Sequence, residues 1–198
     1  MRVLAGIVFL VLTGCGQDIY GKAVSYSPLA PDPIEVTMPK GARFLSQQFS
    51  PRQLDVNYVH YGIDVWGKPG TPIVAAAPGV VVAVFTDPMH GRQVQVLHGT
   101  DADGSIVITT YHHLLSQEVK KGERIARGQR LGTMGSSGMS ALMNHLHFEL
   151  RRGPTRAKAK AVDPHLYWVG GIGKVSCFEP GSDYEVSPIR LTYPTLCR

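Results

Sequence analysis

The stretch NHLHFEL, residues 144–150, alternates polar and apolar side chains. A period of two is the pattern of a β-strand that packs one face on a core, so the three apolar residues face one side. His145, His147 and Glu149 then project together from the other side. The stretch therefore predicts a strand that presents two imidazoles and a carboxylate to a common site.

The same period of two recurs at residues 59–65, whose sequence is VHYGIDV. It places His60, Gly62 and Asp64 on one face of a strand, and two of these three carry groups that bind metals. In a straight strand, residues four apart are separated by about 13 Å, which is too far for one ion. A shared site therefore requires a bend between His60 and Asp64, which Gly62 permits because it lacks a Cβ.

The composition around these stretches predicts a mainly β protein. With 22 Gly and 14 Pro among 198 residues, beside many Val, Ile and Thr, it favours short strands and turns over a helical bundle. A share of 43% apolar and 18% charged residues excludes a disordered chain and a polytopic membrane protein. We expect a single antiparallel β-sheet domain over residues 42–168. Further strands are predicted within 71–87, 93–97, 106–111 and 124–135.

Two further histidines stand side by side, His112 and His113, at the end of a predicted hairpin strand. Neighbouring residues in a strand face opposite sides, so we expect at most one of the two to join a common site. His90, His98 and His165 lack a patterned partner, and we interpret them as hydrogen-bonded structural groups.

The N-terminus resembles a bacterial export signal. Ten apolar residues, 3–12, form a run about half as long as the roughly 20 needed to span a bilayer. The run ends in LTGC, residues 12–15, which resembles the lipobox, where cleavage leaves a lipid-bearing cysteine. We expect a signal peptide over residues 1–14 and a lipid on Cys15, with an ordinary secretory signal as the alternative. The motif predicts a lipid-anchored protein of the cell envelope. If the cell is Gram-negative, Gly16 resembles the residue after the cysteine in outer-membrane lipoproteins, which favours the outer membrane, facing the periplasm.

The two ends of the mature chain differ from its middle. Residues 15–41 carry four prolines and no sustained apolar period, so we predict an extended tether between the lipid and the domain. After export, Cys177 and Cys197 remain as an even pair, which predicts a disulfide in the C-terminal extension over residues 169–198. Closing a loop of about 20 residues stabilises a fold by roughly 3 kcal/mol. Two free buried thiols are the alternative.

The charge balance of the chain is basic, at +5, from 20 Lys and Arg against 15 Asp and Glu. No basic stripe interleaved with aromatic residues and no zinc-finger spacing occurs, so we expect no nucleic-acid partner. Basic residues between 151 and 160 form a loop that contains proline. We interpret this loop as a solvated surface, with polymer binding as the alternative.

Taken together, the histidine motifs and the glycines around them resemble the lysostaphin/LytM-type zinc metallopeptidases of the bacterial cell wall. The resemblance runs from about residue 45 to residue 168. It implies a LytM-like β-sandwich with a groove. The matching stretches are 49–52, 60–64, 70–81, 94–98, 111–114, 128–129, 135–138, 145–149 and 163–164, together with Gly91, Gly122 and Gly132.

The resemblance also implies roles for five residues by their position in the motifs. His60, Asp64 and His147 would bind one Zn²⁺ per chain, and His113 and His145 would be catalytic. Three protein ligands leave a fourth position for water, as in catalytic zinc sites. The implied reaction is amide hydrolysis by a metalloprotease. One departure is the loop before His145, which is one residue longer than the family pattern and borders the implied cleft.

The resemblance and the predicted lipid together imply an envelope lipoprotein that acts as a zinc endopeptidase on the peptide cross-links or stems of peptidoglycan. The alternative is a non-catalytic protein of the same fold that binds the wall or activates a separate peptidoglycan amidase. Such proteins usually lack metal ligands, whereas all five positions are present here. A third hypothesis is a lipoprotein whose histidines buffer zinc, for which His113 would be dispensable.

Overall fold

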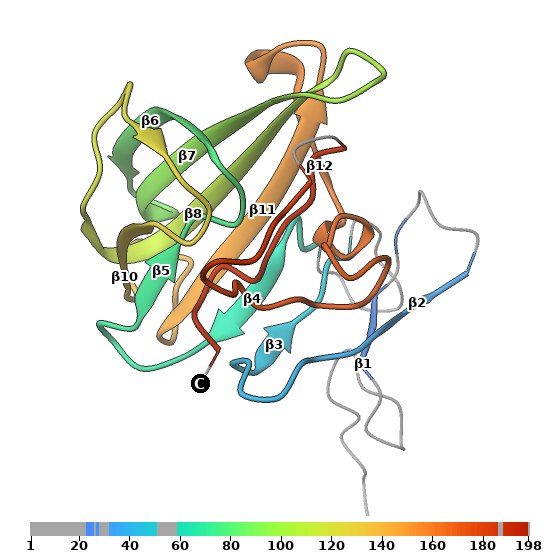
Figure 1. The fold of residues 1–198 in the computed structure, drawn as a ribbon. Coiled ribbons are helices and arrows are strands. Elements are labelled where there is room, and N and C mark those ends of the chain that lie inside the picture. Colours follow the sequence, from blue (N-terminus) through green and yellow to red (C-terminus); the bar gives the residue numbers. More distant parts are fainter. Residues whose placement is uncertain (1–22, 26, 28–31, 51–58, 186–187, 198) are drawn as a thin grey trace, which may run out of the picture.

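The computed structural model describes residues 23–25, 27, 32–50, 59–185 and 188–197, and nearly all of its regular structure is β-strand (Figure 1). The strands are β1 (Ala23–Ser25), β2 (Ile34–Val36), β3 (Leu45–Gln47), β4 (Ile63–Trp66), β5 (Pro72–Val74), β6 (Gly79–Asp87), β7 (Gly91–Thr100), β8 (Ile106–Gln117), β9 (Arg124–Ile125), β10 (Arg130–Met134), β11 (His145–Gly153) and β12 (Lys160–Val162). The described residues also form two 3-10 helices, η1 (Arg156–Lys158) and η2 (Pro164–Leu166). The prediction of a mainly β, antiparallel fold is confirmed.

The main sheet joins segments that are far apart in the sequence. Strands β3, β4, β11, β8, β7, β6 and β9 lie side by side in this order. Strand β10 joins β5 to β8, and β12 pairs with the second half of β11. All of these strand pairs are antiparallel. Because β11 lies between β4 and β8, the two motifs of the sequence occupy neighbouring strands, and His147 is paired with Asp64.

The apolar face of β11 lies at the centre of the core, as its alternation predicts. Leu146, Phe148 and Leu150 are fully buried, and so are Val94 and Val96 on β7. All five belong to one hydrophobic cluster. The polar residues of β11 project from the opposite face. The core and the candidate site therefore lie on opposite sides of the same sheet.

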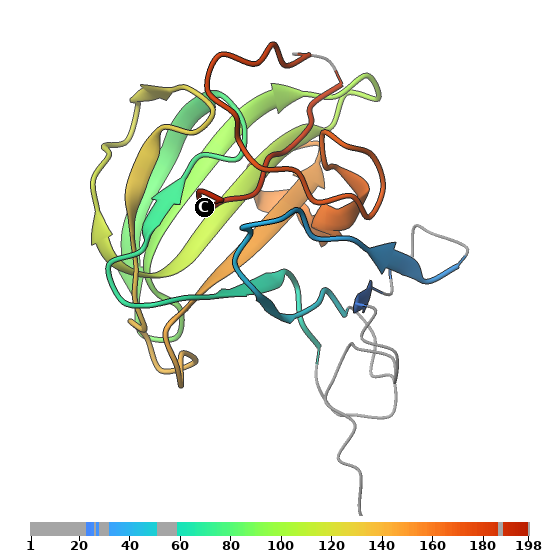
Figure 2. The ribbon, with the colours of Figure 1, turned by 60° about the horizontal axis from the view of Figure 1, so that its bottom comes forward.

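The described part of the C-terminal extension belongs to this core. In Figures 1 and 2 it runs across one face of the sheet, and its backbone pairs with residues 73–76. Leu191 and Tyr193 are fully buried in the same cluster as Trp168. The tail after residue 168 is therefore not a separate appendage, because it covers apolar side chains of the sheet.

Part of the expected N-terminal tether forms the strands β1 and β2 and packs against the domain. Ile34 and Val36 are buried in β2, which pairs with β1, and Thr37 forms a bridge with Lys174 of the C-terminal extension. The expectation fails here because the alternating apolar side chains of β2 meet a surface that includes the tail, far away in the sequence. The predicted signal peptide and Cys15 lie outside the described residues.

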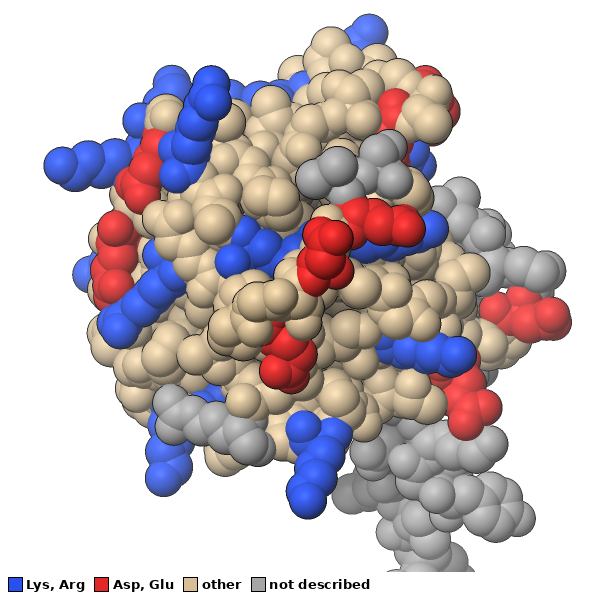
Figure 3. Space-filling model, viewed as in Figure 1, with Lys and Arg blue, Asp and Glu red and all other residues tan. Residues whose placement is uncertain are grey.

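The surface carries charges of both signs. On the face seen in Figure 3, Lys and Arg side chains are interspersed with Asp and Glu. The excess of five positive charges in the sequence is therefore not gathered into one basic patch on this face. No helix within the described ranges is long and apolar enough to cross a membrane.

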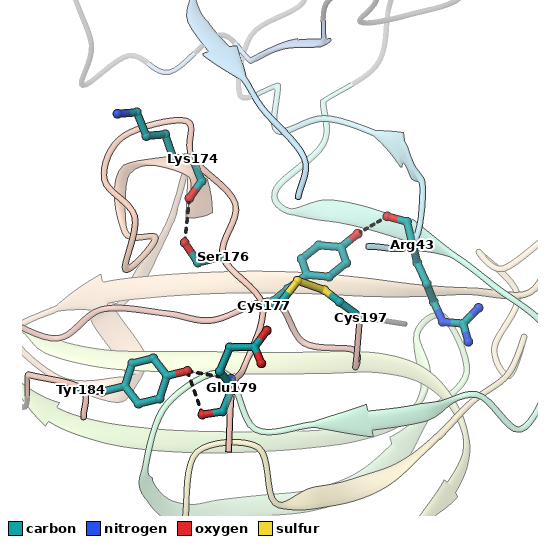
Figure 4. The surroundings of a disulfide bond; sticks show 8 residues. Arg43, Lys174, Ser176, Cys177, Glu179, Tyr184 and Cys197 are labelled. Carbon is teal, nitrogen blue, oxygen red and sulfur yellow. Dashed lines mark hydrogen bonds between the residues drawn. A yellow bond between two sulfur atoms is a disulfide. The ribbon is translucent and has the colours of Figure 1, made fainter. Parts of the chain in front are cut away.

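The expected disulfide between Cys177 and Cys197 is present, at a sequence separation of 20 (Figure 4). Replacing both cysteines by serine should lower the free energy of unfolding by about 3 kcal/mol, because the unfolded chain then regains the entropy of an open loop. Urea denaturation followed by the fluorescence of buried Trp168 measures this change. Reductant should destabilise the wild-type protein to the same extent and leave the double variant unchanged. Equal stability of the two proteins would contradict the prediction.

Candidate metal centre

Three side chains from neighbouring parts of the sheet converge on one point. The Nε2 atom of His60 lies 3.1 Å from Oδ1 of Asp64 and 2.9 Å from Nδ1 of His147, and these last two atoms are 2.8 Å apart. The predicted bend in the chain is present. It lies at Gly62, just before β4, where a Cβ would meet the carbonyl oxygen of Phe148. The bend brings two residues four apart into contact, as a shared site requires.

Oxygen atoms behind the two histidines determine which ring nitrogens carry hydrogen. Nδ1 of His60 lies 2.8 Å from the carbonyl oxygen of Gln48. Nε2 of His147 lies 3.2 Å from Oε1 of Glu149. Since a carbonyl or carboxylate oxygen only accepts hydrogen bonds, each neutral ring donates outward and turns an unprotonated nitrogen toward the other ring. Two lone pairs and the carboxylate of Asp64 thus face one another, and a cation satisfies all three.

The donor set fits zinc. Its three ligand atoms lie within 4.8 Å of one another. Two imidazole nitrogens and a carboxylate oxygen are ligands that zinc prefers, and catalytic zinc sites combine three protein ligands with one open position. The outward hydrogen bonds of His60 and His147 are the contacts that commonly orient metal-binding imidazoles. The residues present are therefore sufficient to hold a catalytic zinc ion.

The charges around the donor set favour a bound cation. Burial raises the pKa of Asp64, but hydrogen bonds from His147 and His60 outweigh it and hold that pKa well below its usual value. Burial lowers the pKa of His147, whereas hydrogen bonds to Asp64 and Glu149 outweigh it and raise the pKa to about 9. In the metal-free protein a proton therefore occupies the donor set, and metal ions must compete with it.

The other two predicted residues, His113 and His145, lie beside the donor set. Their ring centroids are 4.7 Å apart, and Nε2 of His145 is 3.8 Å from Oδ1 of Asp64. Nδ1 of His113 lies 2.8 Å from the carbonyl oxygen of Ser137. Nδ1 of His145 lies 2.8 Å from the carbonyl oxygen of Met143. Both rings thus donate to the backbone and keep Nε2 for the site, and burial lowers the pKa of His113 to about 4, which leaves that ring neutral at neutral pH.

A β-bulge places His112 and His113 on the same side of the sheet, so the expectation that at most one of them joins the site is wrong. The pairing of β7 with β8 shifts by one residue, and both histidines lie opposite Gln93. His113 has a φ of 59°, in the left-handed region. As a result, the ring centroids of His112 and His113 lie 5.0 and 6.2 Å from that of His147.

Three residues without a predicted role also belong to the site: Glu149, Gln48 and His112. Burial raises the pKa of Glu149, but the hydrogen bond from His147 and the charge of His112 lower it to about 2, so the carboxylate stays charged. His112 is buried with Nε2 3.7 Å from Oε1 of Glu149, and neither ring nitrogen has a hydrogen-bond partner in the described part of the chain. The alternation of β11 already pointed Glu149 at the site. Gln48 acts through its backbone and leaves no signal in the sequence.

His165 supports the site from behind, which agrees with the structural role expected for it. Its Nδ1 accepts a hydrogen bond from Nε1 of Trp168 at 2.9 Å, so its Nε2 donates to Oε1 of Gln48 at 2.7 Å. Burial lowers the pKa of His165 to about 3 and keeps the ring neutral. His165 therefore holds Gln48, whose carbonyl group orients His60.

This region of the chain is similar in sequence to known proteins. The family model of Peptidase family M23 matches residues 58–164. The chain is 38% identical over 107 residues to the cell division protein DipM of Caulobacter vibrioides and 37% identical over 110 residues to the peptidoglycan DD-endopeptidase ShyA of Vibrio cholerae. It is 35% identical over 107 residues to the murein hydrolase activator NlpD of Salmonella typhimurium. These matches cover 53%, 54% and 54% of this chain but 17%, 24% and 25% of the relatives, so the chain spans a quarter or less of their length.

Solved structures share the fold. The catalytic domain of the prophage-encoded M23 protein EnpA from Enterococcus faecalis superposes with a TM-score of 0.53 at 28% identity, over 65% of this chain and 94% of that one. The catalytic domain of lysostaphin from Staphylococcus simulans superposes with a TM-score of 0.50 at 29% identity, over 62% of this chain and 89% of that one. These findings confirm the resemblance predicted from the motifs. Since the family model matches more than half of its residues, the chain belongs to peptidase family M23.

Proposed function

We propose that this protein is a zinc endopeptidase that hydrolyses amide bonds in the peptide cross-links or stems of peptidoglycan. The observation that carries the proposal is the convergence of five side chains, of which three form the donor set and two, His113 and His145, stand beside it. A protein that only binds the wall or buffers zinc has no use for this pair. Membership of family M23 and the identity to a peptidoglycan DD-endopeptidase support the reaction and the substrate.

Each of the five residues has a role in such a reaction. His60, Asp64 and His147 would hold the zinc ion, which when bound polarises the scissile carbonyl and lowers the pKa of a coordinated water. His113 is the candidate general base, because its ring is neutral, presents Nε2 and is held at Nδ1 by a backbone carbonyl. His145 can donate from Nε2 to the developing oxyanion in its imidazolium form, since its Nδ1 already donates to the backbone.

The second candidate is a protein that activates a murein hydrolase, the activity in the name of the relative NlpD. That role needs a surface for the partner enzyme and does not need a general base beside a metal. The complete set of five residues favours hydrolysis over activation.

We further propose that Cys15 carries lipid and anchors the protein in the cell envelope, beside its polymer substrate. The support comes from the sequence, in which an apolar run at residues 3–12 ends in a lipobox-like motif. Two or more acyl chains hold a protein on a membrane far better than one chain does. If the cell is Gram-negative, Gly16 favours the outer membrane, facing the periplasm.

The donor set predicts about one zinc ion per purified chain. His60→Ala, Asp64→Ala and His147→Ala should each lose most of the metal, because two remaining ligands hold it poorly. His113→Ala and His145→Ala should keep it. Elemental analysis after dialysis measures the occupancy, and thermal denaturation shows that each variant is folded. Full zinc occupancy in His147→Ala would show that the ligand assignment is wrong.

The roles of His113 and His145 predict that each alanine variant keeps zinc but loses about 10²–10⁴-fold of the rate of hydrolysis, because these residues lower the barrier without holding the ion. Mass analysis of fragments released from purified peptidoglycan, with and without a chelator, measures the rate. An activator would instead release nothing alone and would stimulate an added amidase, equally well with His113→Ala. That pattern would reject the enzyme proposal and leave the family assignment standing.

If Cys15 carries lipid, a Cys15→Ser variant should leave the membrane fraction or keep its signal peptide, because serine offers no thiol for the acyl-bearing group. Cell fractionation and metabolic labelling with a fatty-acid analogue measure the two effects. The wild-type protein should be labelled and the variant should not. Equal labelling of both proteins would disprove this anchor.

A further inference from the structure

The loop that contains η1 folds against the sheet and leaves a cavity of about 340 Å³ that is half open to solvent. The cavity is lined by Gln95, Ile108, Arg151, Arg156, Ala157 and Ala159. The sequence favours a solvated surface for this basic loop over a polymer-binding one. None of the residues that line the cavity takes part in the proposed hydrolysis.

The cavity lies on the face of the sheet that carries the metal centre. His147, Glu149 and Arg151 point to this face because they alternate along β11. Arg151 is paired with Ile108 of β8, and both line the cavity. Arg151 lies four positions after His147 on β11, a separation of about 13 Å, which is the length of about four residues of an extended peptide. This spacing matches a peptide that extends about four residues from the metal centre.

The two arginines of the cavity differ in their partners. Nη1 of Arg151 lies 2.8 Å from Oε2 of Glu149, and its Nη2 donates to the carbonyl of Ala159 at 3.2 Å, so this guanidinium is neutralised and held in place. In the part of the chain that the structure describes, Arg156 has no carboxylate partner and donates only to Oε1 of Gln95, at 3.4 Å. Arg156 thus brings an uncompensated positive charge to the cavity.

Two neighbouring basic residues, Arg152 and Lys158, do not bring an uncompensated charge to the cavity. Arg152 pairs with Asp101 at 2.8 Å and with Asp103 at 2.9 Å, which compensates its charge. Lys158 is exposed, as Arg156 is, but it does not line the cavity. Because Lys158 lies in the same short helix as Arg156 and carries the same charge, it serves as a matched control.

We propose that this cavity binds a carboxylate of the peptide substrate, an inference that rests on the proposed peptidase function. A guanidinium binds a carboxylate through two parallel hydrogen bonds, and Arg156 has no such partner in the described chain. Ile108 and Ala159, which are 3% and 5% exposed, form an apolar wall beside the exposed side chain of Arg156. The bound carboxylate belongs to a chain terminus or to an acidic side chain about four residues from the scissile bond. Arg156 is then a specificity-determining residue.

The kinetic test compares peptidoglycan-derived peptides that have free carboxylates with the same peptides converted to amides. Arg156→Gln should raise KM for the free acids about 10- to 100-fold, because a charge-assisted hydrogen bond is lost, and should leave kcat unchanged. The wild-type protein and Arg156→Gln should have the same KM for the amides. Arg156→Lys should give an intermediate KM, because an ammonium group keeps the charge but not the planar fork. Lys158→Gln should behave as the wild type.

A binding test separates this site from the proposed reaction. Calorimetric titration of the zinc-loaded His113→Ala variant should show tighter binding of free acids than of amides. The double variant that also carries Arg156→Gln should bind the two kinds of peptide equally. One outcome is that the wild-type protein hydrolyses no peptide, while the preference for free acids and its dependence on Arg156 are still observed. In that case the carboxylate site stands and the reaction proposal fails.

Two results would overturn the carboxylate site. One is equal binding of free and amidated peptides by the protein with Arg156 intact. The other is an equal loss of affinity in Arg156→Gln and Lys158→Gln, which would show general attraction between charges. Peptides amidated only at the chain terminus, or only at acidic side chains, identify which carboxylate is bound.

Discussion

The pairing of β11 between β4 and β8 is the constraint on which the candidate site depends. In this register His147 lies opposite Asp64 on one side, and Phe148 lies opposite Tyr111 of β8. A slip of one residue would turn His147 toward the core and expose an apolar side chain at the site. Burial of the apolar face of β11 therefore selects the register in which the metal-binding side chains meet.

Oxygen atoms outside the donor set complete the site. Four histidine rings each form a hydrogen bond to an oxygen atom outside the donor set. The oxygens next to His60, His113 and His145 are backbone carbonyls. Each neutral ring then turns an unprotonated nitrogen to the site, which suits both metal binding and proton transfer. The fourth oxygen belongs to Glu149, which accepts from His147 on one side and from Arg151 on the other. This carboxylate connects the metal centre to the neighbouring cavity.

Segments beyond the family match build part of the domain. Gln48 and His165 lie outside residues 58–164, yet the carbonyl of Gln48 accepts a hydrogen bond from Nδ1 of His60, on the side away from the donor set, and His165 holds the side chain of Gln48. The C-terminal tail fills the core from the opposite face of the sheet, and the disulfide between Cys177 and Cys197 joins the beginning and the end of this tail. The geometry of the donor set therefore depends on more of the chain than the family motif covers.

The sequence by itself determined which side chains of β11 face the core and which face the site, because a strand has a period of two whatever its neighbours. Through its motifs it also predicted the five residues that converge. Only the tertiary structure decided that His112 and His113 share one side, because the bulge arises from the pairing of β8 with β7. It likewise decided the role of Gln48 and the packing of β2 against the tail. A backbone carbonyl is the same for every residue type, and a buried surface built by distant residues leaves no local pattern.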